Sequence, residues 1–239
     1  MAAGAAAGPY ELKPDRWSSH SRLAAVLSRL APGSRVLDVG VGTGALGQLL
    51  RRGGLLLYGL EPQSAWAEAA RPYYQAILPC RLEEAPDSFL AGYDAVVCAD
   101  VLEHLAEPEA ALARLAGLAS PGCLFVVSLP NVANLWVRLQ LLRGRFRYQQ
   151  RGILDRTHLR FFTRETAVEM VVGSGLRVLD VAATPVPLGL AAPGLARLGW
   201  DRALTGALAG LTSLVPGLLG YQFIIRAVKA GTKGGAHEP

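Results

Sequence analysis

The sequence is poor in cysteine, and it lacks the cysteine spacings that carry chemistry. Its three cysteines, Cys80, Cys98 and Cys123, are scattered and odd in number, and no two of them form a CxxC pair. This arrangement excludes a disulfide framework and offers no cysteine ligand set for zinc or an iron–sulfur cluster. Two of the cysteines fall in apolar runs, so we expect buried structural thiols in a reducing cytoplasm.

The sequence also lacks clear signals for secretion and for a membrane-spanning helix. Residues 1–9 form an Ala/Gly tail without the basic and aliphatic regions of a secretory signal. We expect a disordered leader there and a flexible tail at 231–239. Residues 203–225 carry no charge, but glycines and prolines interrupt them, which favours a pair of buried helices followed by a strand over a membrane span. The expected location is the cytoplasm, and peripheral contact with a membrane stays open.

Seven apolar, strand-like runs alternate with helical stretches between residues 10 and 230, which predicts one α/β domain with a mostly parallel sheet. The expected strands are Arg35–Val39, Leu55–Leu60, Gln75–Leu78, Ala95–Cys98, Leu124–Leu129, Arg177–Val181 and Tyr221–Val228. Two insertions interrupt the alternation. One is an arginine-rich, partly helical segment at 131–163, and the other is an apolar helical segment at 185–220.

The first strand runs into a turn with glycine at every second position, Gly40, Gly42 and Gly44. Glycines let a backbone adopt positive φ and approach a ligand closely, and the helix that follows offers free N–H groups. Glu61 ends the next strand, where it can accept hydrogen bonds from two ribose hydroxyls. These residues predict a site for a nucleotide-like cofactor.

Two cofactors fit this turn. The spacing from Gly42 to Gly47 also matches the dinucleotide fingerprint, so an NAD-dependent oxidoreductase on the same topology is an alternative. Asp38 stands directly before the glycines. A carboxylate there repels a pyrophosphate but suits a ligand with ammonium and sulfonium centres. The sequence therefore favours S-adenosylmethionine.

From Tyr10 to Val228 the chain resembles the class I S-adenosylmethionine-dependent methyltransferases, specifically their ubiquinone-biosynthesis-like small-molecule group. The matching stretches are Asp38–Gly44 (first motif), Glu61 (the ribose-binding acid), Tyr93–His104 (fourth strand) and Pro121–Leu124 (turn into strand five). The resemblance implies a doubly wound, Rossmann-like α/β fold with a mostly parallel seven-stranded sheet and an antiparallel last strand. It also implies an enzyme that methylates a small-molecule, glycan or lipid-linked acceptor, most readily at oxygen.

The chain departs from this group after the third strand. An acidic residue usually bonds the adenine amine there, but this chain has Arg81, followed by Leu82. We expect backbone groups near Leu82 to hold adenine, and the affinity for the cofactor to be modest.

The resemblance also implies an acceptor site just after the fourth strand, at Asp100, Glu103 and His104. Asp100 is expected to contact the cofactor, and His104 is the first candidate for a catalytic base. In ubiquinone-type O-methyltransferases a similar acid-x-x-Glu-His set is linked to a divalent ion, so all three residues are candidate ligands of a divalent cation. The alternative is a structural role, in which Glu103 and His104 cap or pack the following helix.

A second dense segment, Arg151–Thr163, resembles the stretch between strands five and six of this group. It combines cations, an imidazole and aromatic rings, which suits an anionic or sugar-bearing substrate. His158 is a second candidate for catalysis, and Arg156 and Arg160 are candidates for binding substrate. Hydrogen bonds that close a lid are the alternative role for His158 and Arg160.

Eight arginines but only one acid, Asp155, lie between Arg138 and Arg164, although the whole chain has a net charge of only +5. Such a segment favours an anionic partner. Nucleic acid is the weaker candidate, because the Asn/Asp-Pro-Pro-aromatic motif of base-modifying amino methyltransferases is absent after the fourth strand. A lid over an anionic small molecule, a lipid-surface contact and a solvated face stay open, as does a complex-forming protein that keeps the fold without turnover. The oligomeric state is not predicted.

Overall fold

The computed structural model describes residues 16–187 and 201–230. The expectations for the leader at 1–9, for the tail at 231–239 and for part of the apolar insertion lie outside these residues. Within them, seven strands form one sheet in the order β3-β2-β1-β4-β5-β7-β6. The strands are β1 (Arg35–Val39), β2 (Leu56–Leu60), β3 (Ala76–Leu78), β4 (Ala95–Ala99), β5 (Leu124–Pro130), β6 (Leu176–Thr184) and β7 (Gln222–Lys229).

Strand β7 is antiparallel to both of its neighbours, β5 and β6, while the other strands share one direction. The predicted fold class is therefore confirmed, including the antiparallel last strand. Strand β6 is longer than predicted, because it stays paired with β7 as far as Thr184, opposite Gln222. The strand order reverses between β1 and β4, and ligands of open α/β sheets bind at such a switch point, beyond the carboxyl ends of the strands.

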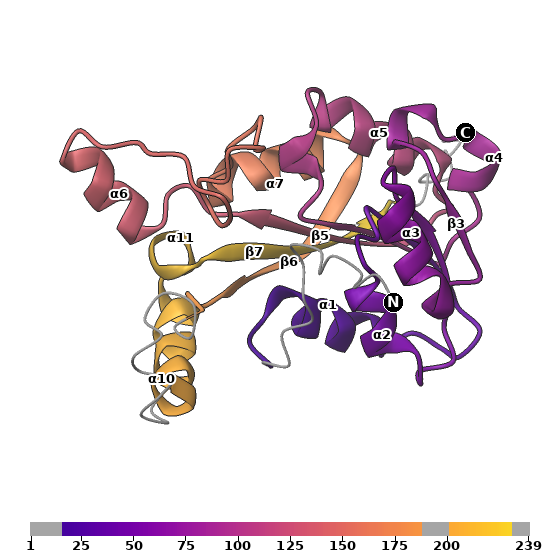
Figure 1. The fold of residues 1–239 in the computed structure, drawn as a ribbon, viewed down its shortest axis with the longest axis horizontal. Helices are drawn as coiled ribbons and strands as arrows, with labels where there is room; N and C mark the ends of the chain where they lie inside the picture. The colour runs from indigo at the N-terminus through magenta and orange to yellow at the C-terminus, as the bar shows by residue number, and fades with distance from the viewer. Residues whose placement is uncertain (1–15, 188–200, 231–239) are drawn as a thin grey trace, which may run out of the picture.

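Helices cover both faces of the sheet (Figure 1). One face packs against α1 (Ser19–Leu27), α2 (Ala45–Leu50) and the end of α3 (Ser64–Ala70). The other packs against α4 (Asp87–Leu90), α5 (Pro108–Leu118) and α7 (Arg164–Gly173). Because both faces are covered, β4 and β5 read as continuous apolar runs instead of alternating ones.

The helices begin where the sequence offers hydrogen-bonding caps. The side chain of Ser18 accepts from the amide of Ser21, 3.2 Å away, at the start of α1. Thr163, the predicted cap, accepts from the amide of Thr166 at the start of α7. Large side chains such as Phe125 and Phe223 then fill the core with no exposed surface. Truncating either to alanine would cost about 3–5 kcal/mol.

Both predicted insertions contain helices. The first holds α6 (Leu135–Leu142), and the second holds α10 (Asp201–Leu214) and α11 (Pro216–Leu219). Two helices followed by a strand were expected over residues 203–225, and they are present. The expected burial of α10 is wrong for one of its faces, because Leu211 and Leu214 are 54% and 78% exposed whereas Thr212 is fully buried. None of the described helices is long and apolar enough to cross a membrane.

The three cysteines are free thiols in the described structure. Cys98 on β4 and Cys123 before β5 are buried, and Cys80 is partly buried. Burial, with nearby acidic charge as a smaller cause, raises the pKa of Cys98 and of Cys123 to about 12. Both therefore stay as unreactive thiols that fill the core.

Candidate active site

The glycine turn after β1 has the backbone that the sequence predicted. Gly40, Gly42 and Gly44 have φ values of 77°, 57° and 86°. A Cβ on Gly40 would lie 2.5 Å from Cγ2 of Val101, and one on Gly44 would lie 2.9 Å from Cα of Ala70. Helix α2 begins at Ala45, one residue later than predicted, because Gly44 is its left-handed N-cap.

Glu61 fastens this turn to the end of β2. Its carboxylate is 4% exposed, and its two oxygens accept from the amides of Gly42 (2.8 Å) and Gln63 (2.9 Å). Carboxylate oxygens have about two lone-pair sites each, so both keep capacity for another donor. Glu61 is thus part of the turn as well as a candidate ligand-binding residue.

Asp38 is more deeply enclosed than its role as a ligand contact suggested. It is 3% exposed and accepts a 2.6 Å hydrogen bond from the hydroxyl of Tyr74. Burial raises the pKa of Asp38 to about 7, with the Tyr74 hydrogen bond opposing the shift and the charge of Glu61 adding to it. A cationic ligand group nearby would favour the carboxylate form. Sequence reasoning missed Tyr74, which lies outside every motif.

The expected adenine end surrounds η2 (Leu82–Glu84), a short 3₁₀ turn after β3. Leu82 is buried, and its carbonyl already accepts a 2.9 Å hydrogen bond from Arg114 of α5, which also bonds the carbonyl of Ala85 at 2.6 Å. The side chain of Arg81 is exposed. Arg114, which the sequence did not reveal, therefore fixes this turn from the neighbouring helix.

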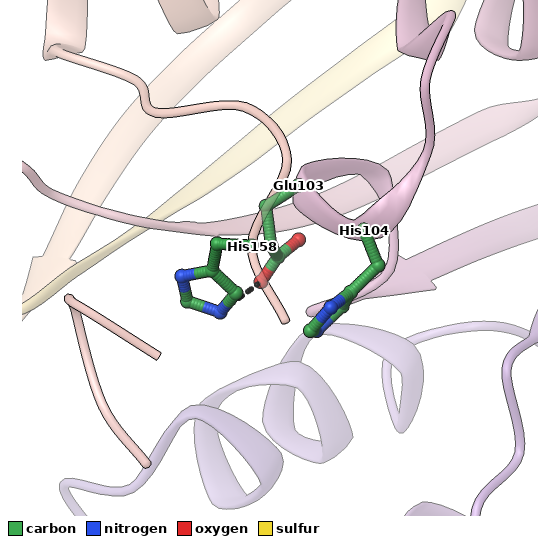
Figure 2. Close-up of side chains that lie close together, drawn as sticks. All are labelled: Glu103, His104 and His158. Carbon is green, nitrogen blue, oxygen red and sulfur yellow. Dashed lines mark ion pairs between the residues drawn. The ribbon is translucent and has the colours of Figure 1, made fainter. Parts of the chain in front are cut away.

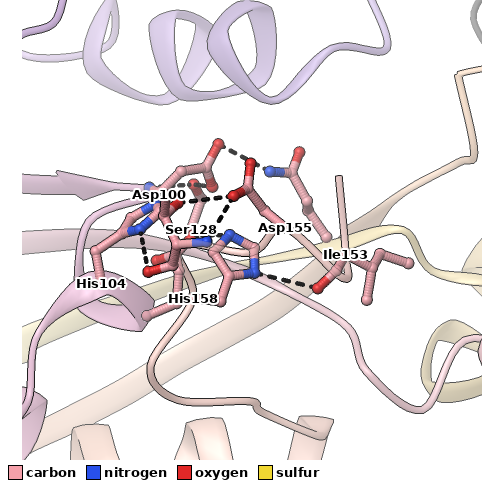
Figure 3. Close-up of polar contacts among 9 residues, drawn as sticks. Asp100, His104, Ser128, Ile153, Asp155 and His158 are labelled. Atoms are coloured by element: carbon pink, nitrogen blue, oxygen red, sulfur yellow. Dashed lines mark hydrogen bonds and ion pairs between the residues drawn. The ribbon is translucent and has the colours of Figure 1, made fainter. Parts of the chain in front are cut away.

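Asp100 follows β4 with a φ of 55°, unusual for a residue other than glycine. This conformation directs its carboxylate toward strands β5 and β7 (Figure 3). Oδ1 accepts from the hydroxyl of Ser128 (2.6 Å), and Oδ2 accepts from the side-chain amide, Nε2, of Gln222 (2.8 Å). Strained backbone of this kind concentrates at functional sites. Sequence reasoning missed Ser128, although a polar residue inside an otherwise apolar strand could have indicated a role at the site.

Glu103 and the two candidate histidines meet beyond the end of β4. Their potential ligand atoms all lie within 4.8 Å of one another, and Figure 2 shows the Glu103 carboxylate between the rings of His104 and His158. Glu103 is 1% exposed, and neither carboxylate oxygen has a hydrogen-bond partner in the described part of the chain. The expected trio of Asp100, Glu103 and His104 is therefore replaced, in space, by Glu103, His104 and His158.

Backbone carbonyls fix the tautomers of both histidines. Nδ1 of His104 lies 3.1 Å from the carbonyl oxygen of Thr157, and Nδ1 of His158 lies 3.1 Å from that of Ile153. A carbonyl only accepts, so each Nδ1 carries the hydrogen and each Nε2 is left as a proton acceptor. Nε2 of His158 lies 4.0 Å from Oε1 of Glu103.

Burial governs the charges in this cluster. It raises the pKa of Glu103 well above its usual range, with the charge of Asp100 as the next cause. It lowers the pKa of His158, with His104 as the next cause. Neutral Glu103 and neutral His158 are therefore the favoured forms, and an unpartnered neutral carboxyl stands beside a free imidazole nitrogen.

The segment that carries His158 is hydrogen-bonded to the backbone of Glu103. The carbonyl of Glu103 accepts from the amides of Leu159 (2.8 Å) and Arg160 (3.1 Å). The guanidinium of Arg160 donates to the carbonyl of Ala106 at 2.6 and 3.0 Å. The amide of Arg156 donates to the carbonyl of Gln149 at 3.0 Å, whereas its exposed side chain forms no hydrogen bond or ion pair in the described residues.

A chain of aromatic rings leads outward from the histidines. Ring centroids are 4.8 Å apart for His104 and His158, 6.2 Å for His158 and Phe161, and 5.8 Å for Phe161 and Phe146. Tyr148 lies beside Phe146 at 5.5 Å. Phe146 and Tyr148 are 42% and 53% exposed, so this ring path joins the buried cluster to the surface.

The fold and the turn after β1 define the class of protein: a Rossmann-like domain with a glycine-rich turn at its switch point. The particular family follows from comparison, because residues 16–181 match the family described as methyltransferase domain. The chain belongs to that family, which confirms the resemblance.

Relatives and solved structures agree with this assignment. A ubiquinone biosynthesis O-methyltransferase from Hahella chejuensis is 32% identical over 122 residues, 47% of this chain and 50% of that protein. A mitochondrial one from Mus musculus is 29% identical over 162 residues, 63% of this chain and 43% of that protein. The chain spans about half the length of the curated relatives it matches.

Among solved structures, a magnesium protoporphyrin IX methyltransferase from Synechocystis PCC 6803 with bound SAH has a TM-score of 0.61. It is 18% identical, with 90% of this chain and 84% of that chain covered, and so supports the fold. These comparisons favour neither an NAD-dependent oxidoreductase nor a protein that keeps the fold without turnover.

Proposed function

We propose that this chain is an S-adenosylmethionine-dependent methyltransferase that methylates a hydroxyl group of a small-molecule acceptor. The observation that carries the proposal is the glycine turn fastened by Glu61 at the switch point of a methyltransferase-family sheet. The names of the relatives, which are O-methyltransferases, favour oxygen as the acceptor atom.

The cofactor would lie across the carboxyl ends of β1 and β2. Glu61 would accept from the ribose hydroxyls, while Gly40, Gly42 and Gly44 allow close approach of the backbone. Asp38 would stabilise the cationic methionine end from beneath the turn. Asp100 would adjoin the reacting centre. Backbone groups near Leu82 would hold adenine through an amide, since the Leu82 carbonyl already bonds Arg114.

When bound, S-adenosylmethionine supplies an electrophilic methyl group on a positively charged sulfur. The chain aligns the acceptor oxygen with that methyl group, which accounts for most of the acceleration of such a transfer. The free Nε2 of His104 would accept the proton of the acceptor hydroxyl as its oxygen bonds to the methyl carbon, while the methyl–sulfur bond breaks and S-adenosylhomocysteine leaves. His158, the more buried of the two histidines, is the second candidate for the base. The side chain of Glu103 lies next to it.

The methyl acceptor is proposed to be an anionic molecule, either free or linked to a lipid. The side chain of Arg156, two residues before His158, is exposed and has no partner in the described residues. The ring path through Phe161 and Phe146 offers aromatic faces to a sugar or aromatic ring. Arg160, which bonds Ala106, is proposed to shape the site instead of contacting the acceptor.

Calorimetric titration of the full chain tests the cofactor. S-adenosylhomocysteine should bind in the micromolar range, and NADH should give no heat. Transfer of a tritiated methyl group to a panel of catechols, phenols and sugar hydroxyls then tests the reaction. Absence of heat with S-adenosylhomocysteine, or tight binding of NADH, would refute the proposal.

Glu103, His104 and His158 also fit a divalent cation, because two imidazole nitrogens and an unpartnered carboxylate are a usual ligand set. We propose such a cation as an alternative role for these residues, in which Nε2 of His104 would bind the cation instead of acting as the base, and the cation would polarise the acceptor oxygen. Equilibrium dialysis with zinc and manganese should show one bound ion that Glu103→Gln and His158→Gln each release. Stoichiometric binding unaffected by both substitutions would place the ion elsewhere.

A further inference from the structure

Helix α6 exposes most of its large apolar side chains instead of burying them. Trp136 is 43% exposed, Leu141 is 50% exposed and Leu142 is 83% exposed, while Leu135 and Leu139 are about equally open at 39% and 40%. Figure 1 shows α6 at the end of an arm that projects away from the sheet. Exposed apolar groups gathered in this way, rather than scattered singly, indicate an interaction site.

The base of this arm is firmly held, so its exposure does not come from a frayed end. Asn134 caps α6 by accepting from the amide of Trp136, and its side-chain amide donates to the carbonyl of Gly220 at 2.8 Å. Asn131, fully buried, donates to the same carbonyl at 2.8 Å. Val137 packs beneath the helix in a small core with Ile153 and Leu154.

Two more exposed apolar residues lie at the end of α10, before the turn that holds the base of α6. Leu214 and Val215 are 78% and 44% exposed. Val215 lies one helical turn before Leu219, whose carbonyl accepts from Asn134 at the start of α6. Helices α6 and α11 are neighbours in Figure 1 as well. We call α6 together with Leu214 and Val215 the arm surface.

Cations without partners follow the helix directly. The side chains of Arg145, Arg147 and Arg151 are exposed, and their guanidinium groups form no hydrogen bond or ion pair in the described residues. Residues 135–154 contain no acidic residue at all. The arm surface therefore combines exposed leucine and tryptophan with uncompensated positive charge.

We propose that the arm surface docks on an anionic lipid bilayer. Interfacial helices combine apolar side chains, tryptophan and arginine in this way, with the apolar groups entering the headgroup region and the cations meeting anionic lipids. A second copy of the chain is the less suitable occupant. A symmetric contact would bring the same arginines face to face with no acid between them.

Docking would place the acceptor site next to the bilayer. Phe146 and Tyr148 directly follow the arm helix, and Phe146 contacts Phe161, which contacts His158. A lipid-linked hydroxyl could then approach the histidines from the surface of the membrane. This consequence rests on the proposed function, whereas docking itself does not.

Vesicle co-sedimentation of the full chain tests the docking without cofactor or turnover. Vesicles of phosphatidylcholine with about one-third phosphatidylglycerol should bind the protein, and pure phosphatidylcholine should bind it far less. Trp136→Glu/Leu142→Glu should weaken binding at least about tenfold, and so should Arg145→Glu/Arg147→Glu. The matched controls are Val172→Glu on α7, an exposed apolar residue outside the arm, and Arg177→Glu on β6.

Each outcome decides the proposal. Equal binding by the arm variants and their controls would overturn it, and so would equal binding to neutral and anionic vesicles. A dimer in light scattering that Trp136→Glu/Leu142→Glu converts to monomer would assign the arm surface to a second copy instead. Unchanged melting temperatures of the variants would exclude unfolding as the cause of lost binding. Normal S-adenosylhomocysteine binding with failed docking would leave the proposed function intact.

Discussion

The two ends of the proposed active site are built in different ways. At the cofactor end, the hydrogen bond from Gly42 to Glu61 spans 19 residues and lies within one strand–helix–strand unit. At the acceptor end, the contact from His104 to Thr157 spans 53 residues and that from Gln222 to Asp100 spans 122. The first end depends on backbone conformation, and the second depends on side chains that only the complete fold brings together.

This difference predicts that the two ends can be damaged separately. A change at the histidines should stop transfer and spare cofactor binding. A change at the turn should remove the cofactor and spare the histidine cluster.

The largest expected effect is on turnover. His104→Ala should lower kcat by about 10²- to 10⁴-fold, because the acceptor proton loses its base. The affinity for S-adenosylhomocysteine should stay within about twofold of the original, since His104 is proposed to act on the acceptor and not to hold the cofactor. The measurements are tritiated-methyl transfer to the panel member that turns over and calorimetric titration, with His20→Ala on α1 as the control. Loss of cofactor binding in His104→Ala would show that the two ends are not separable.

The next effect is on cofactor affinity. Glu61→Ala should weaken binding of S-adenosylhomocysteine by about 10²-fold, because charged hydrogen bonds to ribose and to the amide of Gly42 disappear together. Glu68→Ala, at an exposed position of α3, is the matched control. Calorimetry provides both affinities. Equal affinities for the two variants would remove Glu61 from the site.

A third prediction concerns the stability of the turn. Gly40→Ala should lower the free energy of unfolding by about 2–4 kcal/mol, because its φ of 77° is unfavourable for alanine and the added Cβ would clash with Val101. Gly117→Ala, inside α5 with open space around it, should raise that free energy by up to about 1 kcal/mol. Urea unfolding measures both. A harmless Gly40→Ala would mean that the turn tolerates side chains.

The smallest effect is the pH dependence of the unliganded protein. Because burial raises the pKa of Asp38 from 3.8 to about 7, the native state holds a proton that the unfolded chain releases. The stability gained from that proton is lost as the pH rises from about 4 to about 7. Asp38→Asn, which keeps an acceptor for Tyr74, should reduce the fall in melting temperature between these pH values by a few degrees. An unchanged fall would assign the titration to other groups.

The sequence was sufficient for the fold and for the backbone of the glycine turn because both depend on local patterns. Apolar runs, glycine spacing and the position of Glu61 each follow from neighbouring residues in the chain. Helix ends followed equally local signals, as Ser18 and Thr163 illustrate.

The acceptor end was less predictable, because the hydrogen-bond partners of its side chains depend on how segments distant in the sequence pack together. Spacing alone grouped Asp100 with Glu103 and His104, whereas the positive φ of Asp100 turns it toward Ser128 and Gln222. The exposed face of α10 was missed for a related reason. An apolar stretch of sequence does not by itself predict whether its side chains pack against protein or face solvent.

The carbonyl of Gly220 accepts from both Asn131 and Asn134, and thereby joins the two insertions of the domain at a single atom. A Cβ on Gly220 would lie 2.3 Å from the carbonyl oxygen of Pro216, so this junction requires glycine. In the described residues the two insertions are therefore held together, although α7 and β6 separate them along the chain. A chimera that takes Asn131 and Asn134 from a relative should also take the turn around Gly220, so that both amides keep their acceptor.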